Sequence, residues 1–152
     1  GVPLIVSHMF VFYFGIMADL TPPVALAAFA AAPIARESGL KISLQALRVA
    51  IAGFIVPFMA VYSPALMLQG GGALATAYVV FKALIAIGMW GAGAIGFLFG
   101  PLNLLERLAA IVAASFLVAA LPMTDEIGLA AVVAFLAWHV WRTRAARHST
   151  VA

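Results

Sequence analysis

Apolar positions form long runs along this chain, and short polar segments separate them. Residues 49–68 and 73–99 each reach the roughly 20 residues that a helix needs to cross the hydrocarbon core of a membrane. The shorter apolar runs cover 3–20, 24–35, 108–121 and 127–141. The pattern predicts an all-α integral membrane protein, because a helix pairs its backbone groups internally where lipid offers no water to do so.

Capping signals lengthen the two short apolar runs near the end of the chain. Asn103 and Glu106 have the spacing of a capping box, which predicts a helix from roughly 103 to 121. Thr124 and the two acids after it predict the start of the last helix, where negative charge is favourable. The predicted order is a discontinuous transmembrane helix at 1–35, a cytoplasmic amphipathic arm helix at 36–48, two transmembrane helices at 49–99, a C-terminal transmembrane helix pair at 100–141 and a basic cytoplasmic tail at 142–152.

The first apolar segment is interrupted in its middle by Thr21, Pro22 and Pro23. A proline inside a helix lacks the backbone donor and clashes with the preceding turn, at a cost of roughly 3 kcal/mol or more. It also pushes the residue before it out of the helical region. Two consecutive prolines therefore predict an unwound elbow at Leu20–Thr21, which breaks the helix into two halves.

The elbow places oxygen ligands within an apolar segment. Broken helices in transporters bind cations through freed carbonyl groups, and Thr21 and Asp19 add a hydroxyl and a carboxylate, donors that hard cations prefer. An ionisable group inside a span is a functional candidate. A second interpretation stays open, in which Thr-Pro-Pro is a loop at the membrane surface and Asp19 is a solvated acid or a helix cap. The apolar arms on both sides favour a buried elbow, since Ser7 and His8 are the polar residues of 4–18.

Lysine and arginine predict the orientation of the chain, because cytoplasmic loops of membrane proteins are enriched in both. Basic residues occur at 36–48, at 100–107 and in the tail, whereas the turns at 69–75 and 122–128 contain none. We therefore expect the basic segments and the C-terminus to be cytoplasmic. The segment 36–48 is also amphipathic with a helical period, which is typical of a helix at the membrane interface.

Composition supports the membrane class and excludes several functions. The chain is 66% hydrophobic and 9% charged with a mean hydropathy of +1.19, against about 45–50% apolar and about 25% charged residues in soluble domains. There is no cysteine, which excludes disulfides and thiolate chemistry. Neither a Gly-x-Ser-x-Gly turn nor a His-Glu-x-x-His motif occurs, so neither an enzyme nor a bound cofactor is predicted. The orientation explains the tail arginines, and no nucleic-acid partner is predicted.

Two stretches resemble the large permease subunit of TRAP (tripartite ATP-independent periplasmic) transporters. They are HMFVFYFGIMADLTPPVALAAFAAAPIA at 8–35 and ALRVAIAGFIVPFMAVYSPALML at 46–68. The later segments PLNLLERL and LPMTDEIGLAAVV resemble the extra C-terminal helices of the fused small-plus-large type that works with TAXI-family solute receptors. Because the chain starts without Met inside an apolar run, we expect it to be the C-terminal portion of a longer permease.

The resemblance implies an elevator-type secondary transporter in a bacterial or archaeal inner membrane. A periplasmic receptor would deliver a small organic acid, and an inward Na⁺ gradient, or H⁺ in some members, would drive its uptake. Gly15, Thr21, Pro22 and Pro23 match the family motif, and the carbonyls from Gly15 to Leu20 with the Thr21 hydroxyl would coordinate Na⁺. The resemblance does not assign a ligand role to Asp19, and we consider it a Na⁺ or proton group particular to this type.

The resemblance also implies partners for this chain. The first repeat of the permease and the small-subunit helices would supply the other half of any ion or solute site. We therefore expect that residues 1–152 alone do not transport. The alternative is a structural membrane subunit or scaffold without an ion or solute site of its own.

Three further features have structural interpretations. Lys82 is expected to extend its ammonium to the membrane interface, and His139 is expected at the membrane edge. The small residues Gly88, Ala92, Gly96 and Gly100 recur every four positions, which predicts a helix surface that a neighbouring helix approaches closely.

Overall fold

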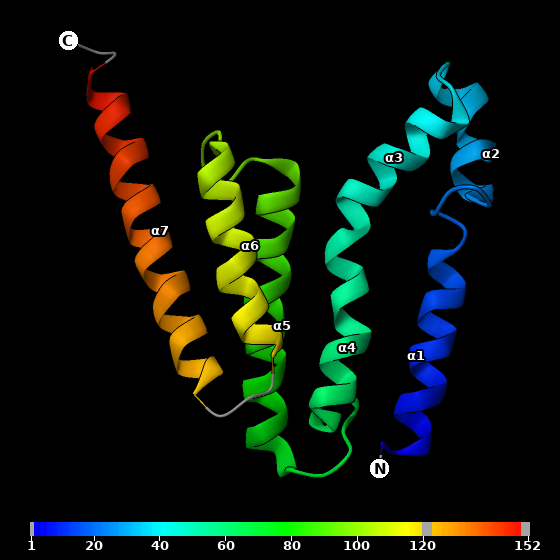
Figure 1. Ribbon diagram of the computed structural model, residues 1–152, viewed down its shortest axis with the longest axis horizontal. Coiled ribbons are helices and arrows are strands. Elements are labelled where there is room, and N and C mark those ends of the chain that lie inside the picture. Colours follow the sequence, from blue (N-terminus) through cyan, green and yellow to red (C-terminus); the bar gives the residue numbers. More distant parts are fainter. Residues whose placement is uncertain (1, 120–122, 150–152) are drawn as a thin grey trace.

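The computed structural model describes residues 2–119 and 123–149, without the side chains of residues 52 and 145–149, and the described residues are all-helical (Figure 1). The α-helices are α1 (Leu4–Met17), α2 (Leu26–Ala35), α3 (Gly39–Ala50), α4 (Ile55–Tyr62), α5 (Gly72–Ile95), α6 (Leu104–Val118) and α7 (Thr124–Ser149). Short 3₁₀ helices cover Ile51–Phe54 and Pro64–Met67. The predicted all-α membrane fold is thus confirmed.

Three stretches of the described residues are long and apolar enough to cross a membrane: Gly39–Tyr62, Gly72–Ile95 and Thr124–Arg144. The fourth predicted span is shorter than expected, because α6 has 15 residues. It begins after Asn103, where the predicted capping box is confirmed, and its last turn gives way to extended backbone at Ala119. The expected end of this helix near residue 121 lies outside the described residues.

The predicted arm helix forms, and it runs directly into the first long span. α3 and α4 are joined by the 3₁₀ turn Ile51–Phe54, and Gly39–Tyr62 is one apolar helical stretch. Pro57 explains the local tightening, because it removes an α-helical donor just after this turn. The span ends at Tyr62 because the next residue, Ser63, precedes Pro64 and leaves the helical region, with φ of −131° and ψ of 83°.

α2 and α3 form a tight helical hairpin. Ser38 caps α3 by accepting the Lys41 backbone N–H at 3.3 Å, and the Lys41 ammonium lies 2.5 Å from a Glu37 carboxylate oxygen. Gly39 is buried against the Phe29 ring, and a Cβ at this position would lie 2.1 Å from the ring. Close contact between the two helices therefore requires glycine at this position.

The hydrophobic core lies among α4, α5, α6 and α7. Its fully buried centre includes Met59, Ala86, Ala114 and Leu117. α1 joins this core from outside through a cluster of phenylalanine rings on α1, on α4 and on the turn before α4. Figure 1 shows α1 alongside α4, with α2 and α3 at one end of the molecule.

α5 and α6 approach each other closely at Gly93, which is not a member of the predicted stripe of small residues. A Cβ on Gly93 would lie 2.6 Å from Ile111 Cγ1, whereas a Cβ on Gly88 would meet nothing within 4 Å. Gly96 lies beyond the end of α5 and caps it in the left-handed conformation. The predicted stripe is not one continuous helix surface, because α5 ends before its last two members; of these, Gly100 does lie close to another helix, since a Cβ there would be 2.9 Å from Thr143 on α7.

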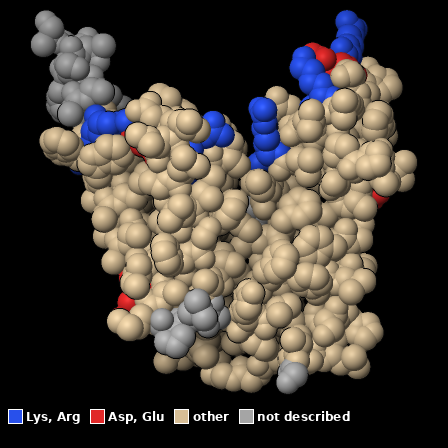
Figure 2. All heavy atoms as spheres, viewed as in Figure 1, with Lys and Arg blue, Asp and Glu red and all other residues tan. Residues whose placement is uncertain are grey.

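Charged side chains are strongly segregated along the molecule. Figure 2 shows Lys and Arg gathered at one end, over α3, the α5–α6 turn and the end of α7. The basic segments that the sequence assigned to one side of the membrane therefore lie at the same end of the fold. α7 continues through these residues to Ser149, so the basic segment begins as helix.

Candidate functional site

The discontinuous helix predicted at Thr-Pro-Pro is present. α1 ends at Met17, residues 18–24 form turns, and α2 begins at Leu26. The α-helical hydrogen bonds to the carbonyl four residues earlier end with the Ala18 amide, and the Thr21 amide is the last one before two prolines, which provide none. The sequence therefore determines where the helix breaks.

Most backbone groups freed by the break bind one another. The amides of Asp19, Leu20 and Thr21 each donate to the carbonyl three residues earlier, at 3.1–3.2 Å. From the downstream side, the Ala25 amide donates to Ala18 O at 3.2 Å, and the Ala27 amide donates to Asp19 O at 3.1 Å. The first amides after the break thus cap the upstream half, as buried backbone groups require.

This pairing reduces the number of backbone carbonyls that are free to bind a cation. Each carbonyl from Gly15 to Asp19 accepts at least one hydrogen bond from a backbone amide. The next carbonyl, that of Leu20, accepts no hydrogen bond from the described residues. Leu20 is therefore the best placed of the predicted carbonyl ligands, because its oxygen has both lone pairs available.

The predicted side-chain ligands differ in how firmly they are held. Thr21 Oγ1 donates to the Met17 carbonyl at 2.8 Å and is partly buried, so its hydrogen is engaged while its lone pairs remain available to a cation. Asp19 is exposed, and among the described residues its carboxylate has no hydrogen-bond or ion-pair partner. Gly15 is exposed on α1, and Pro22 and Pro23 shape the turn without offering a side-chain ligand.

Ala25 closes the elbow in an unusual conformation. It is fully buried and adopts the left-handed region with φ of 40°, where a residue with a Cβ is strained by about 1–2 kcal/mol. Its amide also donates to Thr21 O at 3.0 Å. The strained residue therefore ties the downstream helix to the Thr21 turn.

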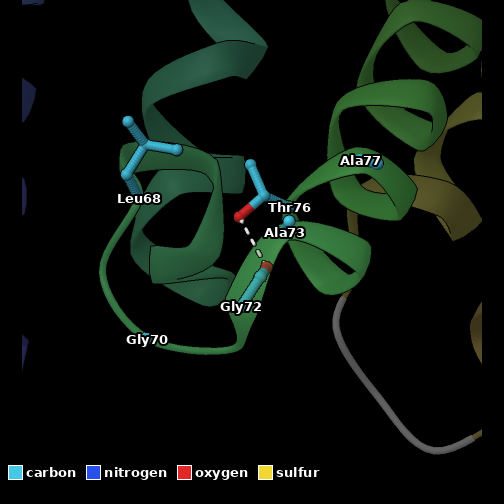
Figure 3. A pocket seen from close by; sticks show the side chains of 6 residues that line it. All are labelled: Leu68, Gly70, Gly72, Ala73, Thr76 and Ala77. Carbon is cyan, nitrogen blue, oxygen red and sulfur yellow. Dashed lines mark hydrogen bonds between the residues drawn. The ribbon is translucent and has the colours of Figure 1, made fainter.

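A cavity of about 450 Å³ lies away from the elbow, where the 3₁₀ turn Pro64–Met67 leads into α5 (Figure 3). Leu68, Gly70, Gly72, Ala73, Thr76 and Ala77 line it. The Thr76 hydroxyl donates to the Gly72 carbonyl at 3.1 Å, and none of the described residues that line the cavity is charged. The described lining therefore offers a mainly apolar surface without an ionisable ligand.

The expectation for Lys82 was wrong. Its side chain is 4% exposed, and its ammonium lies 2.9 Å and 3.0 Å from the two carboxylate oxygens of Asp125. The Tyr78 hydroxyl donates to the same carboxylate at 3.2 Å. A cation deep in a helix bundle is held by a partner of opposite charge, and here the acid at the start of α7 provides it.

His139 does not have the exposed side chain expected of an interfacial residue. Its side chain is fully buried, it stacks on Phe135, and its Nε2 contacts the Leu98 carbonyl. Buried Glu106 lies beside it, with Oε1 at 3.9 Å from His139 Nδ1, and also pairs with Arg142. The sequence identified Glu106 as a helix cap but gave no sign of this cluster. The available signal was a carboxylate, Glu106, in a mostly apolar helix.

Metal binding by protein side chains alone has little support in the described part of the chain. No group of three or more His, Cys, Asp or Glu side chains that could hold a metal ion occurs there. A cation at the elbow would therefore depend on backbone and hydroxyl oxygens together with Asp19, a ligand set that suits a weakly bound hard cation.

The first half of the chain is similar to a known family. Residues 1–71 match the family model described as "Tripartite ATP-independent periplasmic transporter, DctM component". No curated protein and no solved structure matches the chain. The matched residues include the elbow, the α2–α3 hairpin and the α3–α4 span. Residues 1–71 are thus similar to the DctM component of TRAP transporters, a family of membrane transporters.

Proposed function

We propose that this chain is the C-terminal part of a secondary active TRAP permease of the fused type associated with TAXI receptors. The permease imports a small organic acid, delivered by a periplasmic receptor, by an elevator-type movement coupled to Na⁺ or H⁺. The supporting observation is the helix break at Thr21–Pro23, which lies inside the segment that matches the DctM component.

The elbow is our proposed contribution to cation binding. The Leu20 carbonyl, the Thr21 hydroxyl and the Asp19 carboxylate provide oxygen ligands within one turn of the chain. The remaining ligands come from the first repeat of the permease. This division explains why we expect transport only from the complete permease.

The segregation of charge supports a location in the inner membrane with the C-terminus in the cytoplasm. Apart from Lys82, which pairs with Asp125 at the start of α7, the Lys and Arg side chains visible in Figure 2 gather at one end of the fold, and cytoplasmic ends of membrane proteins carry an excess of these residues. The opposite end, which holds the turn before α5, would then face the periplasm and the receptor.

The decisive experiment is solute uptake by the full-length permease in proteoliposomes with its receptor. Thr21→Ala removes one ligand and should lower Na⁺-dependent uptake by about tenfold, the factor expected for losing a modest hydrogen-bonding contact to a charged group. Thr21→Ser keeps the hydroxyl and should restore most of the uptake. Asp19→Asn tests whether the carboxylate carries Na⁺ or a proton.

Thr76→Ala is the matched control. Thr76 makes the same hydroxyl contact to the carbonyl four residues earlier as Thr21 does, but on α5 and away from the elbow. Its uptake should equal that of the wild type. Unchanged Na⁺ dependence in both Thr21→Ala and Asp19→Asn would contradict our proposal and would favour a structural subunit.

A further inference from the structure

A second cavity lies at the basic end, between the DctM-like half of the chain and the residues after it. Its volume is about 320 Å³, near the lower limit of ordinary ligand pockets. Gln45, Arg48, Val49, Ala94, Ile95 and Arg107 line it. Figure 2 shows the surface hollowed at this end, with basic side chains on both sides of the hollow.

The two guanidinium groups of this cavity lack an acidic partner among the described residues. Arg107 is anchored through Nε to Gly93 O at 2.7 Å and through Nη2 to Ala94 O at 2.8 Å. Its Nη1 group has no described partner, and Arg48 is exposed with none at all in the described part of the chain. The cavity therefore presents positive charge and free N–H donors.

Two other cations at this end, Lys41 and Arg142, have acidic partners. Lys41 is paired with Glu37, and Arg142 is paired with buried Glu106. Within the described residues, the acids at this end of the fold are thus already used, and they do not neutralise the cavity. Guanidinium groups with free donors bind phosphate oxygens well, since their planar fork matches the geometry of that anion.

The apolar lining shows which kind of phosphate compound fits. Val49 is 69% exposed and Ile95 is 59% exposed, and both lie next to the guanidinium groups. An exposed apolar side chain beside an anion site suits a ligand with a hydrocarbon part. Basic pockets between transmembrane helices at the cytoplasmic side are typical sites for anionic lipid headgroups.

We propose that this cavity binds the phosphate of an anionic phospholipid, with Arg48 and Arg107 on the phosphate and with acyl chains along Val49 and Ile95. The lipid then connects α3, which belongs to the DctM-like half, with the end of α5 and the start of α6. It stabilises the contact between the permease domain and the C-terminal helices. The proposal depends on the membrane location of the chain and not on its transport activity.

The test compares lipid binding by the intact protein purified in detergent, using native mass spectrometry and thermal unfolding. Phosphatidylglycerol should be retained and should raise Tm, whereas phosphatidylcholine should do neither. Arg48→Gln should weaken the binding of phosphatidylglycerol about fivefold, the factor for one arginine near an anionic membrane surface. Arg48→Lys keeps the charge and should retain most of the binding.

Arg36→Gln is the matched control, because Arg36 follows α2 in the turn that leads into α3 and carries the same charge without lining the cavity. Arg48 makes no described hydrogen bond, so Tm without lipid should be the same for wild type, Arg48→Gln and Arg36→Gln. Equal loss of lipid binding in the two variants would overturn the proposal, as would equal retention of the neutral lipid. Binding of inorganic phosphate alone with the same strength would overturn the assignment to a lipid headgroup.

Discussion

The Lys82 ammonium lies 2.9 Å from Oδ1 of Asp125, so a cation within α5 is tied to the first turn of α7. The two partners are not equally buried. The Lys82 side chain is 4% exposed and the Asp125 side chain is 30% exposed. The energetic consequences of removing one partner therefore depend on which charge is left behind.

We predict that Asp125→Ala destabilises the protein more than Lys82→Met. The first substitution leaves a buried ammonium without a counter-charge, which costs about 3 kcal/mol or more when a buried pair is broken. The second leaves a carboxylate that reaches water, and we expect a loss of about 1 kcal/mol, the contribution of an ordinary hydrogen bond. Thermal unfolding of the purified protein in detergent measures both.

The double variant Lys82→Met with Asp125→Ala removes both charges, so it shows how much of the loss in Asp125→Ala comes from the unpaired ammonium. It should be more stable than Asp125→Ala alone, because the unpaired buried charge is gone. Glu126→Gln is the control, since Glu126 is the neighbouring acid on α7 and is exposed. If Asp125→Ala and Glu126→Gln have the same Tm, the buried pair does not contribute to stability.

A second prediction concerns Glu106, which has two separate tasks. Its Oε2 accepts the Asn103 backbone N–H at 2.6 Å and completes the capping box, while Oε1 pairs with Arg142. Glu106→Gln keeps an oxygen for the cap but loses the charge that faces Arg142. Glu106→Ala loses both interactions.

We therefore expect a graded decrease in Tm. Glu106→Gln should cost about 1 kcal/mol, because Arg142 is partly exposed and keeps its bond to the Pro101 carbonyl. Glu106→Ala should cost about 2–3 kcal/mol, since losing a cap adds about 1 kcal/mol and the cavity adds the rest. Identical Tm values for the two variants would show that the cap contributes nothing beyond the ion pair.

Local sequence signals predicted the parts of the fold that depend on neighbouring residues. Pro22 and Pro23 determine the elbow, and Asn103 with Glu106 determines the start of α6, because each acts on backbone groups within one turn. Both features are present as predicted. The segregation of arginine and lysine likewise follows from the order of the loops along the chain.

Contacts between distant segments could not be predicted in this way. Lys82 and Asp125 are 43 residues apart, and His139 meets the Leu98 carbonyl 41 residues away. From the sequence alone, Lys82 and His139 were each expected at the membrane interface. Which carbonyls of the elbow stay free also depended on the return of the Ala25 and Ala27 amides, which no local pattern indicated.

Small residues on α5 provide a third prediction, because two glycines of the same helix differ in their surroundings. A Cβ on Gly93 would lie 2.6 Å from Ile111 Cγ1 and 3.0 Å from the Arg107 carbonyl oxygen, whereas one on Gly88 would meet nothing within 4 Å. Gly93→Ala should therefore push α5 and α6 apart and destabilise the protein by about 1–3 kcal/mol. Gly88→Ala should be neutral or stabilise it by up to about 1 kcal/mol through helix propensity.

Thermal unfolding of the two variants in detergent provides the comparison, with Gly88→Ala as the matched control. Adding Ile111→Ala to Gly93→Ala should not restore full stability, because the shorter side chain removes one clash but the Arg107 carbonyl stays in place. Equal Tm values for Gly93→Ala and Gly88→Ala would contradict the close approach of the helices. Such a result would mean that α5 and α6 are separated by at least a methyl group at this level, since only then would both positions accept a Cβ without displacement.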